Sequence, residues 1–395
     1  MVLKLPLARW ACLPFYLIGG WTCTQWSLEL YGHRSAWIAA ALWAFSPEFL
    51  GHGALMTADA HASSLALFAS HQLWRWQHSH RRGNAIVAGI SIGLAALSKS
   101  TLILLYPAAA ACLLLHRGRN RPRWFSIATV FLVGLYVINA GYGFKGSLTP
   151  IGDYTFTSST LKGNASNSLG NRFSGAFFGN LPVPLPRDFI LGIDTQKHDF
   201  ERGIRSYMHG TWSDHGWISF YAYALLVKSP VGNLALLLLA VLSFLRAPRP
   251  RPEGLLIVFP FILFATASLH TGFSLHSRYV MPVLPFMFVF SSRLLRDGVV
   301  NCRLAVAVGL LVAWSSCSSL AVFPHSLSYF NEFAGGPGGG YHHLVDSNIA
   351  WGQDLLFLRD WQKSHPNAAP LHLVSFGLVD PRLAGIDSEL GIAPK

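Results

Sequence analysis

Long apolar runs constrain this chain more than any other feature of its sequence. A helix needs about 20 mostly apolar residues to cross a bilayer, and fewer where neighbouring helices shield it. About ten segments qualify, so the sequence predicts an all-α polytopic membrane protein. The segments are Arg9–Leu30, Ser35–Leu50, Met56–Leu73, Ala85–Leu97, Thr101–Leu115, Trp124–Gly141, Tyr223–Leu245, Leu255–Ser268, Arg278–Phe290 and Leu304–Val322.

The composition supports this class. Only 12% of the residues are charged, whereas soluble domains contain roughly 25%, so a water-soluble globule is excluded. A disordered chain is excluded by the 13% of aromatic residues. Thirty basic and eighteen acidic residues give a net charge of +12. We attribute this excess to basic cytoplasmic loops rather than to nucleic-acid binding.

The basic clusters fall in alternate loops, which assigns every second loop to the cytoplasm. We therefore expect a transmembrane domain over 1–323, with a long outer-face loop at 142–221. An outer-face segment, which we expect to be incomplete, follows over 324–395. Within it, Gln353–Gln362 reads as an amphipathic helix and Leu371–Phe376 as a strand, so a small α/β unit is predicted.

A polar cluster stands where one short outer loop enters a predicted span. It contains His52, Asp59 and His61. Ionisable groups at membrane depth are costly and usually face a cavity or a partner. A carboxylate here could act as a base, bind a cation or orient a sugar hydroxyl. A polar helix start, capped by Thr57 or Asp59, explains the pattern equally well.

Cations also stand at the ends of apolar runs. Lys99 and Lys228 have the depth at which a lipid phosphate would need a charge partner, although a snorkelling lysine would have the same position. Arg278 and Tyr279 open a span before Met281. They suit either a buried cation site or an interfacial aromatic–basic anchor.

The tail carries a third polar cluster, with Asp346, Asn348 and Trp351. Amides and carboxylates can pair with sugar hydroxyls, and an indole can stack on sugar C–H faces. The alternative is an N-capped helix, with Asp346 or Asn348 at the cap. Nucleotide-driven, metalloprotease and esterase chemistry find no motif in this sequence. A divalent cation at the site is left open, although no cluster of ligand residues in the sequence marks a metal site.

Several stretches, taken in order, resemble the protein O-mannosyltransferase superfamily, or glycosyltransferase family 39, whose bacterial branch includes the aminoarabinose transferases. They are LWAFSPEFLGHGALMTADAHASSLALF, AGISIGLAALSKST, LLVKSP, HSRYVMPVLPF and YFNEFAGGPGGGYHHLVDSNIAWGQDL. The resemblance implies a GT-C helix bundle in the plasma (inner) membrane. It also implies transfer of a sugar from a polyprenyl-phosphate carrier to an acceptor hydroxyl at the outer face.

The resemblance also assigns residues. Asp59 matches the family's second acidic position, near the sugar. Lys99 is similar to the family's lysine beside the carrier phosphate. Arg278 lies in what resembles the family's arginine–tyrosine helix, for which no role is assigned. The implied partners are a polyprenyl-phosphate-linked sugar and an acceptor of unassigned identity.

The sequence departs from this family at two points. The family's principal catalytic aspartate lies in a first outer loop that has no counterpart before Arg9, and Ala350 stands where the tail motif usually has an aspartate. We therefore expect a chain shortened at its N-terminus. The alternative function is a non-catalytic remnant, or a membrane subunit that binds lipid or glycan. A transporter is a third hypothesis, disfavoured because no paired inverted repeat is evident.

Overall fold

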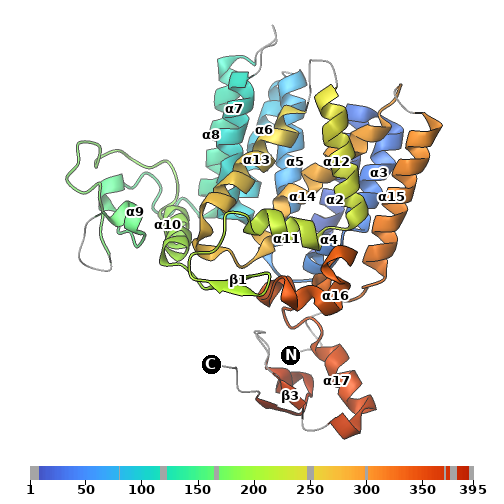
Figure 1. Ribbon diagram of the computed structural model, residues 1–395. Helices are drawn as coiled ribbons and strands as arrows, with labels where there is room; N and C mark the ends of the chain where they lie inside the picture. Colours follow the sequence, from blue (N-terminus) through green and yellow to red (C-terminus); the bar gives the residue numbers. More distant parts are fainter. Residues whose placement is uncertain are drawn as a thin grey trace.

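The computed structural model describes residues 9–79, 81–115, 122–163, 169–246, 253–298, 301–368, 371–373 and 380–390. Most of these residues form one helix bundle, with a loop region on one side and a small unit below it (Figure 1). The expected class, a mainly helical polytopic membrane protein with a small α/β segment at its C-terminal end, is confirmed.

Helices occupy each of the predicted spans in the first part of the chain. They are α2 (Leu13–Tyr31), α3 (His33–Ala44), α4 (Pro47–Gly53), α5 (Ala58–Ser79), α6 (Arg82–Ser98), the 3-10 helix η2 (Ser100–Leu104), α7 (Leu105–Leu115) and α8 (Trp124–Gly141). The predicted span Ser35–Leu50 is wrong as one helix. It breaks at Ser46, because the fixed ring of Pro47 favours a new helix start there.

The second part of the chain adds five longer helices and several 3-10 turns. The helices are α11 (Phe220–Lys228), α12 (Val231–Arg246), α13 (Gly254–Leu269), α14 (Leu284–Ser292) and α15 (Cys302–Leu320). The turns η4 (Thr271–Phe273), η5 (Ser277–Tyr279), η6 (Met281–Val283) and η7 (Arg293–Leu295) flank α14. Tyr223–Leu245 is also wrong as a single span, since α11 and α12 meet at 117°. Pro230 sits at this break, where it cannot donate a helical hydrogen bond.

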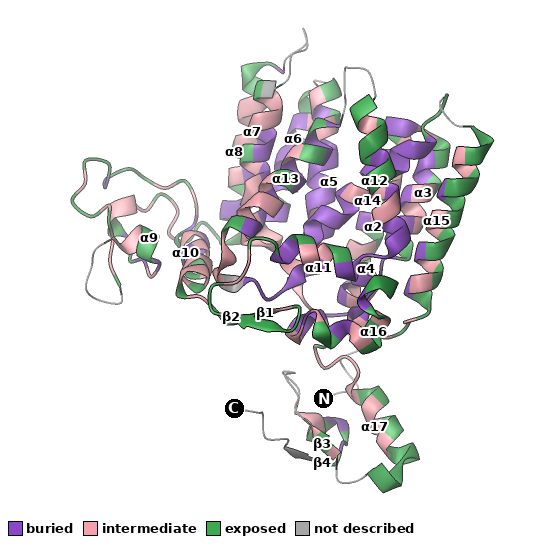
Figure 2. Cartoon of the chain, in the orientation of Figure 1, coloured by how far each residue is buried: buried purple, intermediate pink, exposed green. Residues whose placement is uncertain are grey.

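Among the described residues, α8 and α15 are long and apolar enough to cross a membrane on their own. The bent pair α11–α12 would make a third span, and the remaining apolar helices are shorter. The two long helices lie on the outside of the bundle and expose apolar side chains such as Leu132 and Leu310 (Figure 2). The interior is closed by large buried rings, including Trp26, Trp76 and Phe286. This distribution fits a bundle with a lipid-facing rim.

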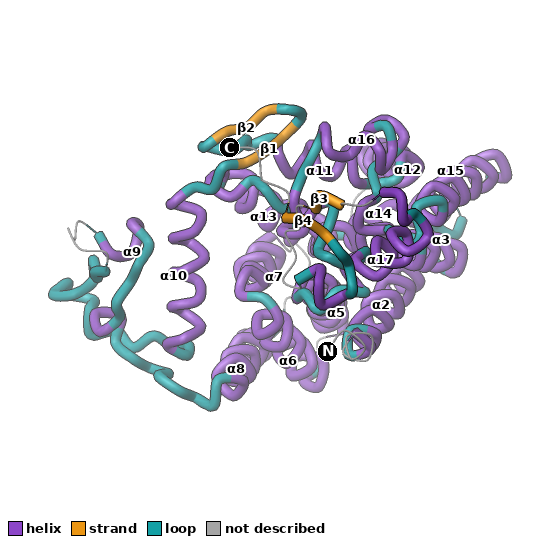
Figure 3. The backbone as a smooth tube through the Cα atoms, turned by 90° about the horizontal axis from the view of Figure 1, so that it is seen from below, coloured by secondary structure: helices purple, strands orange, loops and turns teal. Residues whose placement is uncertain are grey.

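The predicted outer loop contains short elements. They are α9 (Ser159–Lys162), α10 (Arg187–Arg202) and an antiparallel hairpin of β1 (Ser206–Met208) and β2 (Thr211–Ser213). The tail contains α16 (Gly336–Gly339), α17 (Leu355–Ser364) and two parallel strands, β3 (Leu371–Leu373) and β4 (Ser388–Leu390). Seen from below, the tail covers the middle of the bundle, and α10 with α9 stands to one side (Figure 3). The predicted strand starts correctly at Leu371, but its second half lies outside the described residues.

Close backbone contact joins α6 to α8. A side-chain carbon at Gly89 would lie 2.7 Å from the Val130 carbonyl oxygen, and one at Gly93 would lie 2.6 Å from Val137 Cβ. These glycines are four residues apart, which is the small-residue spacing that lets helices approach closely in membranes. The α6–α8 contact therefore depends on the absence of side chains at these two positions.

Gly93→Val should destabilise the protein by about 1–3 kcal/mol, the usual range for overpacking a filled interface. A lower unfolding midpoint in detergent would report this loss. Gly309→Val is the matched control, because Gly309 is exposed on α15 with no heavy atom near its missing side chain. Equal midpoints for the two variants would contradict the proposed packing.

Candidate functional site

Two cations converge on one carboxylate at one end of the bundle. The Lys99 ammonium donates a 2.7 Å hydrogen bond to Asp59 Oδ1, and Arg278 Nε lies 3.9 Å from Asp59 Oδ2. All three side chains are mostly buried, with exposed fractions of 13%, 8% and 16% for Lys99, Asp59 and Arg278. The structure thus brings together three residues that are far apart in sequence.

Local folding explains why these groups meet. Asp59 lies in the first turn of α5, where a carboxylate is favoured by the helix dipole. Lys99 is the residue at which α6 ends, in an extended conformation. Arg278 belongs to the short turn η5, which follows α13. Each charge therefore stands where a helix starts or stops, at the same end of the bundle.

Aromatic rings enclose this cluster. The Lys99 ammonium lies 5.1 Å from the centre of the Tyr279 ring, and the Arg278 guanidinium lies 4.6 Å from that of Trp351. Such cation–π contacts strengthen as water is excluded. The indole N–H of Trp351 is buried and has no acceptor among the described residues. The tail thereby contributes both a wall and an unused hydrogen-bond donor.

An apolar groove of about 180 Å³ adjoins the cations. It runs between η2, α10 and α13, starts at Ser100 beside Lys99, and includes Tyr279. Its lining is mostly apolar, and its residues are Ser100, Thr101, Ile103, Leu104, Ile193, Gln196, Lys197, Phe200, Leu263, Thr266, Ala267, His270 and Tyr279. A charged head and an apolar groove are therefore neighbours.

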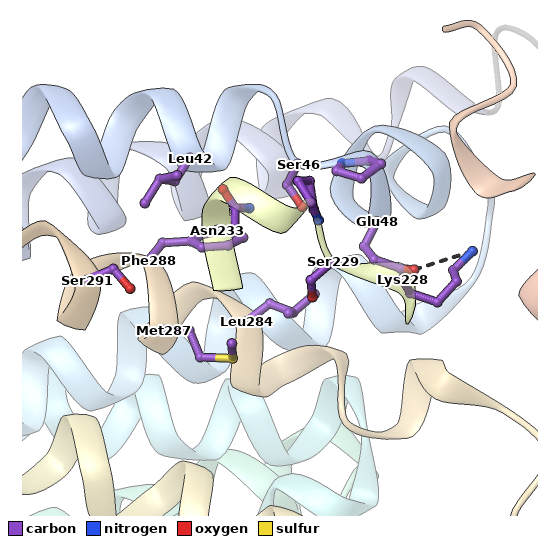
Figure 4. Close-up of a pocket in the computed structure, with 12 residues that line it drawn as sticks. Leu42, Ser46, Glu48, Lys228, Ser229, Asn233, Leu284, Met287, Phe288 and Ser291 are labelled. Atoms are coloured by element: carbon purple, nitrogen blue, oxygen red, sulfur yellow. Dashed lines mark ion pairs between the residues drawn. The ribbon is translucent and has the colours of Figure 1, made fainter. Parts of the chain in front are cut away.

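A second buried cluster surrounds Glu48 (Figure 4). Glu48 Oε1 lies 3.5 Å from the Lys228 ammonium, and Glu48 Oε2 lies 3.5 Å from His52 Nε2. Lys228 also donates hydrogen bonds of 2.7 and 2.8 Å to the carbonyl oxygens of Leu327 and Asn348. Lys228 is therefore satisfied by the protein itself, whereas Lys99 has the more open surroundings.

Asn348 links the two clusters. Its amide nitrogen donates to the Leu275 carbonyl at 2.7 Å, and its amide oxygen accepts from the Ser277 N–H at 2.9 Å. Since Ser277 precedes Arg278, the tail helps to hold the turn that carries this arginine. Next to it, burial and the Arg278 charge lower the pKa of His276 to about 4, so His276 is neutral at physiological pH.

The remaining predicted residues have other surroundings. His61 lies against the Phe15 ring, with ring centres 4.7 Å apart. Asp346 adopts a positive φ of 61°, and its carboxylate accepts a hydrogen bond from the Ser347 N–H. The helix-capping alternative for the tail is not seen, because the residue preceding α17 is Asp354 and Asn348 bonds to other segments. Among the described residues, no group of three His, Cys, Asp or Glu side chains could hold a metal ion.

Sequence reasoning missed Glu48. The signal was available, because an acidic residue inside the predicted span Ser35–Leu50 is as unusual as Asp59 and invites a search for its partner. Its partner is Lys228, whose depth alone suits a lipid phosphate equally well. The two halves of the pair are 180 residues apart, a distance over which spacing carries no information.

Glu48→Gln should destabilise the protein by about 3–5 kcal/mol, because it leaves the buried Lys228 charge without its counter-ion. Asp360→Asn, at a carboxylate that is 62% exposed in its pair with Arg359, should change the free energy of unfolding by less than about 0.5 kcal/mol. Denaturation in detergent compares the two variants. A Glu48→Gln protein as stable as the control would show that the ion pair is unimportant.

Comparison with known proteins locates the relationship in the first third of the chain. The sequence model of the dolichyl-phosphate-mannose-protein mannosyltransferase family matches residues 8–140. No curated protein sequence matches significantly.

Solved structures give weaker similarities. ArnT from Cupriavidus metallidurans bound to undecaprenyl phosphate is 15% identical, with a TM-score of 0.48 over 95% of this chain and 69% of that one. The Archaeoglobus fulgidus oligosaccharyltransferase tethered with an acceptor peptide is 13% identical, with a TM-score of 0.49 over 92% of this chain. This chain spans 47% of that enzyme's length. Over residues 8–140, which include Asp59 and Lys99, the resemblance to the protein mannosyltransferase family is confirmed.

Proposed function

We propose that this chain is a membrane glycosyltransferase that moves a sugar from a polyprenyl-phosphate carrier to an acceptor hydroxyl. One observation carries the proposal: Lys99 and Arg278, two cations that meet at Asp59, directly precede Ser100 and Tyr279, which line an apolar groove. A polyprenyl phosphate has the complementary form, an anionic head on an apolar chain. The family that matches residues 8–140, named for dolichyl-phosphate-mannose, supports the same chemistry.

The charge balance of the cluster favours an anionic ligand. Lys99 and Arg278 bring two positive charges, and Asp59 offsets one of them. A phosphate oxygen would therefore meet a net positive site with several N–H donors, in surroundings where charge-assisted hydrogen bonds are strong. Lys228 is a poorer candidate for the phosphate, because Glu48 and two carbonyl oxygens already engage its ammonium.

The groove accounts for the carrier chain. Ser100 lines it directly after Lys99, and the Tyr279 ring faces both the groove and the lysine. A phosphate held by Lys99 would thus place the first isoprene units against Ile103, Leu104 and Leu263. Burying this apolar surface would add to binding without contributing to the chemical step.

Transfer requires one bond to form and one to break at the sugar's anomeric carbon. The acceptor oxygen bonds to this carbon while the carbon–oxygen bond to the carrier phosphate breaks. Lys99 and Arg278 would stabilise the negative charge that develops on the leaving phosphate. The acceptor's proton must pass to a base, and Asp59 is the carboxylate in this cluster. A carrier phosphate that draws Lys99 away from Asp59 would leave this carboxylate freer to accept the proton.

The sugar itself would lie near the tail. Trp351 offers a buried N–H that has no acceptor in the part of the chain that the structure describes, and its ring already packs against Arg278. Asp346 and Asn348 border the same turn, although Asn348 is occupied by backbone contacts. The proposal leaves the acceptor's identity and the use of a metal open. It places this end of the bundle at the outer face and the protein in the inner membrane. The resemblance to the protein O-mannosyltransferase superfamily supports both of these locations.

A second function, binding of the lipid phosphate without transfer, is favoured by one observation. Asp59 is engaged by Lys99 at 2.7 Å and approached by Arg278. Two neighbouring cations stabilise its ionised form and weaken it as a base. The two functions predict the same ligand and differ only in turnover.

Binding and transfer are therefore measured separately, in membranes that contain the full chain. Lys99→Ala should weaken binding of undecaprenyl phosphate and lower transfer of labelled sugar by about 10²–10³, as expected when one donor to a developing charge is removed. Asp59→Asn should lower transfer more than binding. Arg359→Ala, in α17 and paired with Asp360 rather than with the cluster, is the control for both assays.

Unchanged binding and transfer in both site variants would remove these residues from the site. If the wild-type chain binds the carrier through Lys99 and transfers no sugar, the second function replaces the first.

A further inference from the structure

The loop that follows α8 exposes an unusual amount of apolar surface. Five side chains, which we call the loop patch, are Phe144, Leu148, Phe177, Phe178 and Leu181, and their exposed fractions are 50%, 61%, 102%, 48% and 61%. Single exposed apolar residues are normal on protein surfaces, whereas a group on one segment indicates an interaction site. The loop patch therefore calls for a partner.

Backbone pairing brings the two halves of the loop patch together. The Leu148 N–H donates to the Val183 carbonyl, and the Ile151 N–H donates to the Leu181 carbonyl, both at 3.0 Å. Pro150 and Pro182 form a bridge between these contacts. Leu148 and Leu181 are thus neighbours on one ribbon. Phe177 and Phe178 lie in the turn just before Leu181, where the Leu181 N–H donates to the Phe178 carbonyl at 3.0 Å.

This ribbon is folded, because it has its own interior. Tyr154 and Phe156 are buried and stack with parallel rings, 5.5 Å between centres. The Asn171 amide donates to three backbone carbonyls, at residues 151, 152 and 154. The loop therefore separates its aromatic residues into a buried set and an exposed set. The packing of the buried set therefore fixes Phe177 in its exposed position.

Two carboxylates of α10 fasten the loop. Asp194 accepts hydrogen bonds from the Thr157 N–H at 2.6 Å and the Ser158 N–H at 3.1 Å. Glu201 accepts from Thr160 and Ser159. Burial opposes ionisation of both, but these hydrogen bonds outweigh it, lowering the pKa of Asp194 and bringing that of Glu201 to about 2. Both carboxylates, Asp194 and Glu201, are therefore ionised at physiological pH.

The loop patch continues the lipid-facing surface of α8. On that helix, Leu132 and Tyr136 are 64% and 63% exposed. The Tyr136 ring contacts Phe144, with ring centres 5.5 Å apart. Figure 1 shows the loop beside the bundle, at the height of the lower part of α8, rather than beneath the helix ends. An apolar stripe thus passes from a membrane span into the loop.

The net charge of this loop also favours a lipid surface as its partner. Residues 142–188, which reach the first turn of α10, contain four basic residues and two acidic residues, Asp153 and Asp188. Basic residues next to an inserted apolar surface attract anionic headgroups. The basic residues are Lys145, Lys162, Arg172 and Arg187.

We infer that the loop patch is a membrane anchor, which inserts into the headgroup–acyl boundary of the leaflet at the C-terminal end of α8. A soluble protein partner would not require continuity with the lipid-facing side of a span. Because α10 carries both the loop's fastenings and one wall of the groove, the anchor also fixes that wall relative to the bilayer. This inference is independent of sugar transfer.

Spin labels on the full chain in nanodiscs test the anchor. The background replaces all five cysteines, and the label is placed by Phe177→Cys or, separately, Leu181→Cys. Asp214→Cys is the aqueous control, because its side chain is 80% exposed on the same long loop, beyond α10. We expect labels at 177 and 181 to be several-fold more accessible to oxygen than to a water-soluble nickel reagent, with the reverse at 214. Accessibility to nickel at 177 and 181 equal to that at 214 would overturn the inference.

Two further measurements separate the alternatives. Dipolar coupling between labels at 177 on two copies would assign the loop patch to a self-interface and overturn the inference. A Phe177→Ser, Phe178→Ser variant should raise nickel accessibility at a label introduced by Leu148→Cys, most strongly in nanodiscs with anionic lipid. Its unfolding midpoint should change little, since Phe177 is fully exposed and Phe178, whose ring contacts Phe173, is half-exposed. A variant with no change at 148 would count against insertion.

Discussion

The cost of leaving a charge unpaired away from water organises this structure. A buried ion that loses its counter-ion destabilises a protein far more than a surface ion does. Asp59 meets Lys99, Glu48 meets Lys228, and the buried Glu253 lies 3.5 Å from Arg293. Each pair joins segments distant in the sequence, so pairing fixes which helix ends must meet. Apolar packing alone, being non-directional, would not specify these contacts.

Much of the helical architecture could be predicted because apolar runs report helix positions directly. The boundaries of α8, α13 and α15 fall within three residues of the predicted spans. The errors arose at prolines, where an apolar run continues although its helix does not. Pro47 and Pro230 break two predicted spans. Hydropathy averages over a window and does not detect a change of direction within it.

The candidate site was only partly accessible from sequence. A charge near an apolar run identifies Asp59, Lys99 and Arg278 one by one, and the structure brings them together. The same reasoning grouped Lys228 with the phosphate ligands, because depth in a membrane does not reveal whether a lysine already has partners. Asn348 was expected to bind sugar or cap a helix, and its backbone contacts across 73 residues depend on the fold of the tail.

The sharp bend between α11 and α12 has a mechanical consequence. Asn331, from the tail, donates hydrogen bonds to the carbonyl oxygens of Leu226 and Ser229, which the break leaves without helical partners. Lys228 connects the same elbow to α4 and to Asn348. Contacts to Asn331, to α4 and to Asn348 therefore hold the break between α11 and α12. Any swing of α11 would pull α4 and the tail with it, so this end of the molecule would shift as one block or stay still.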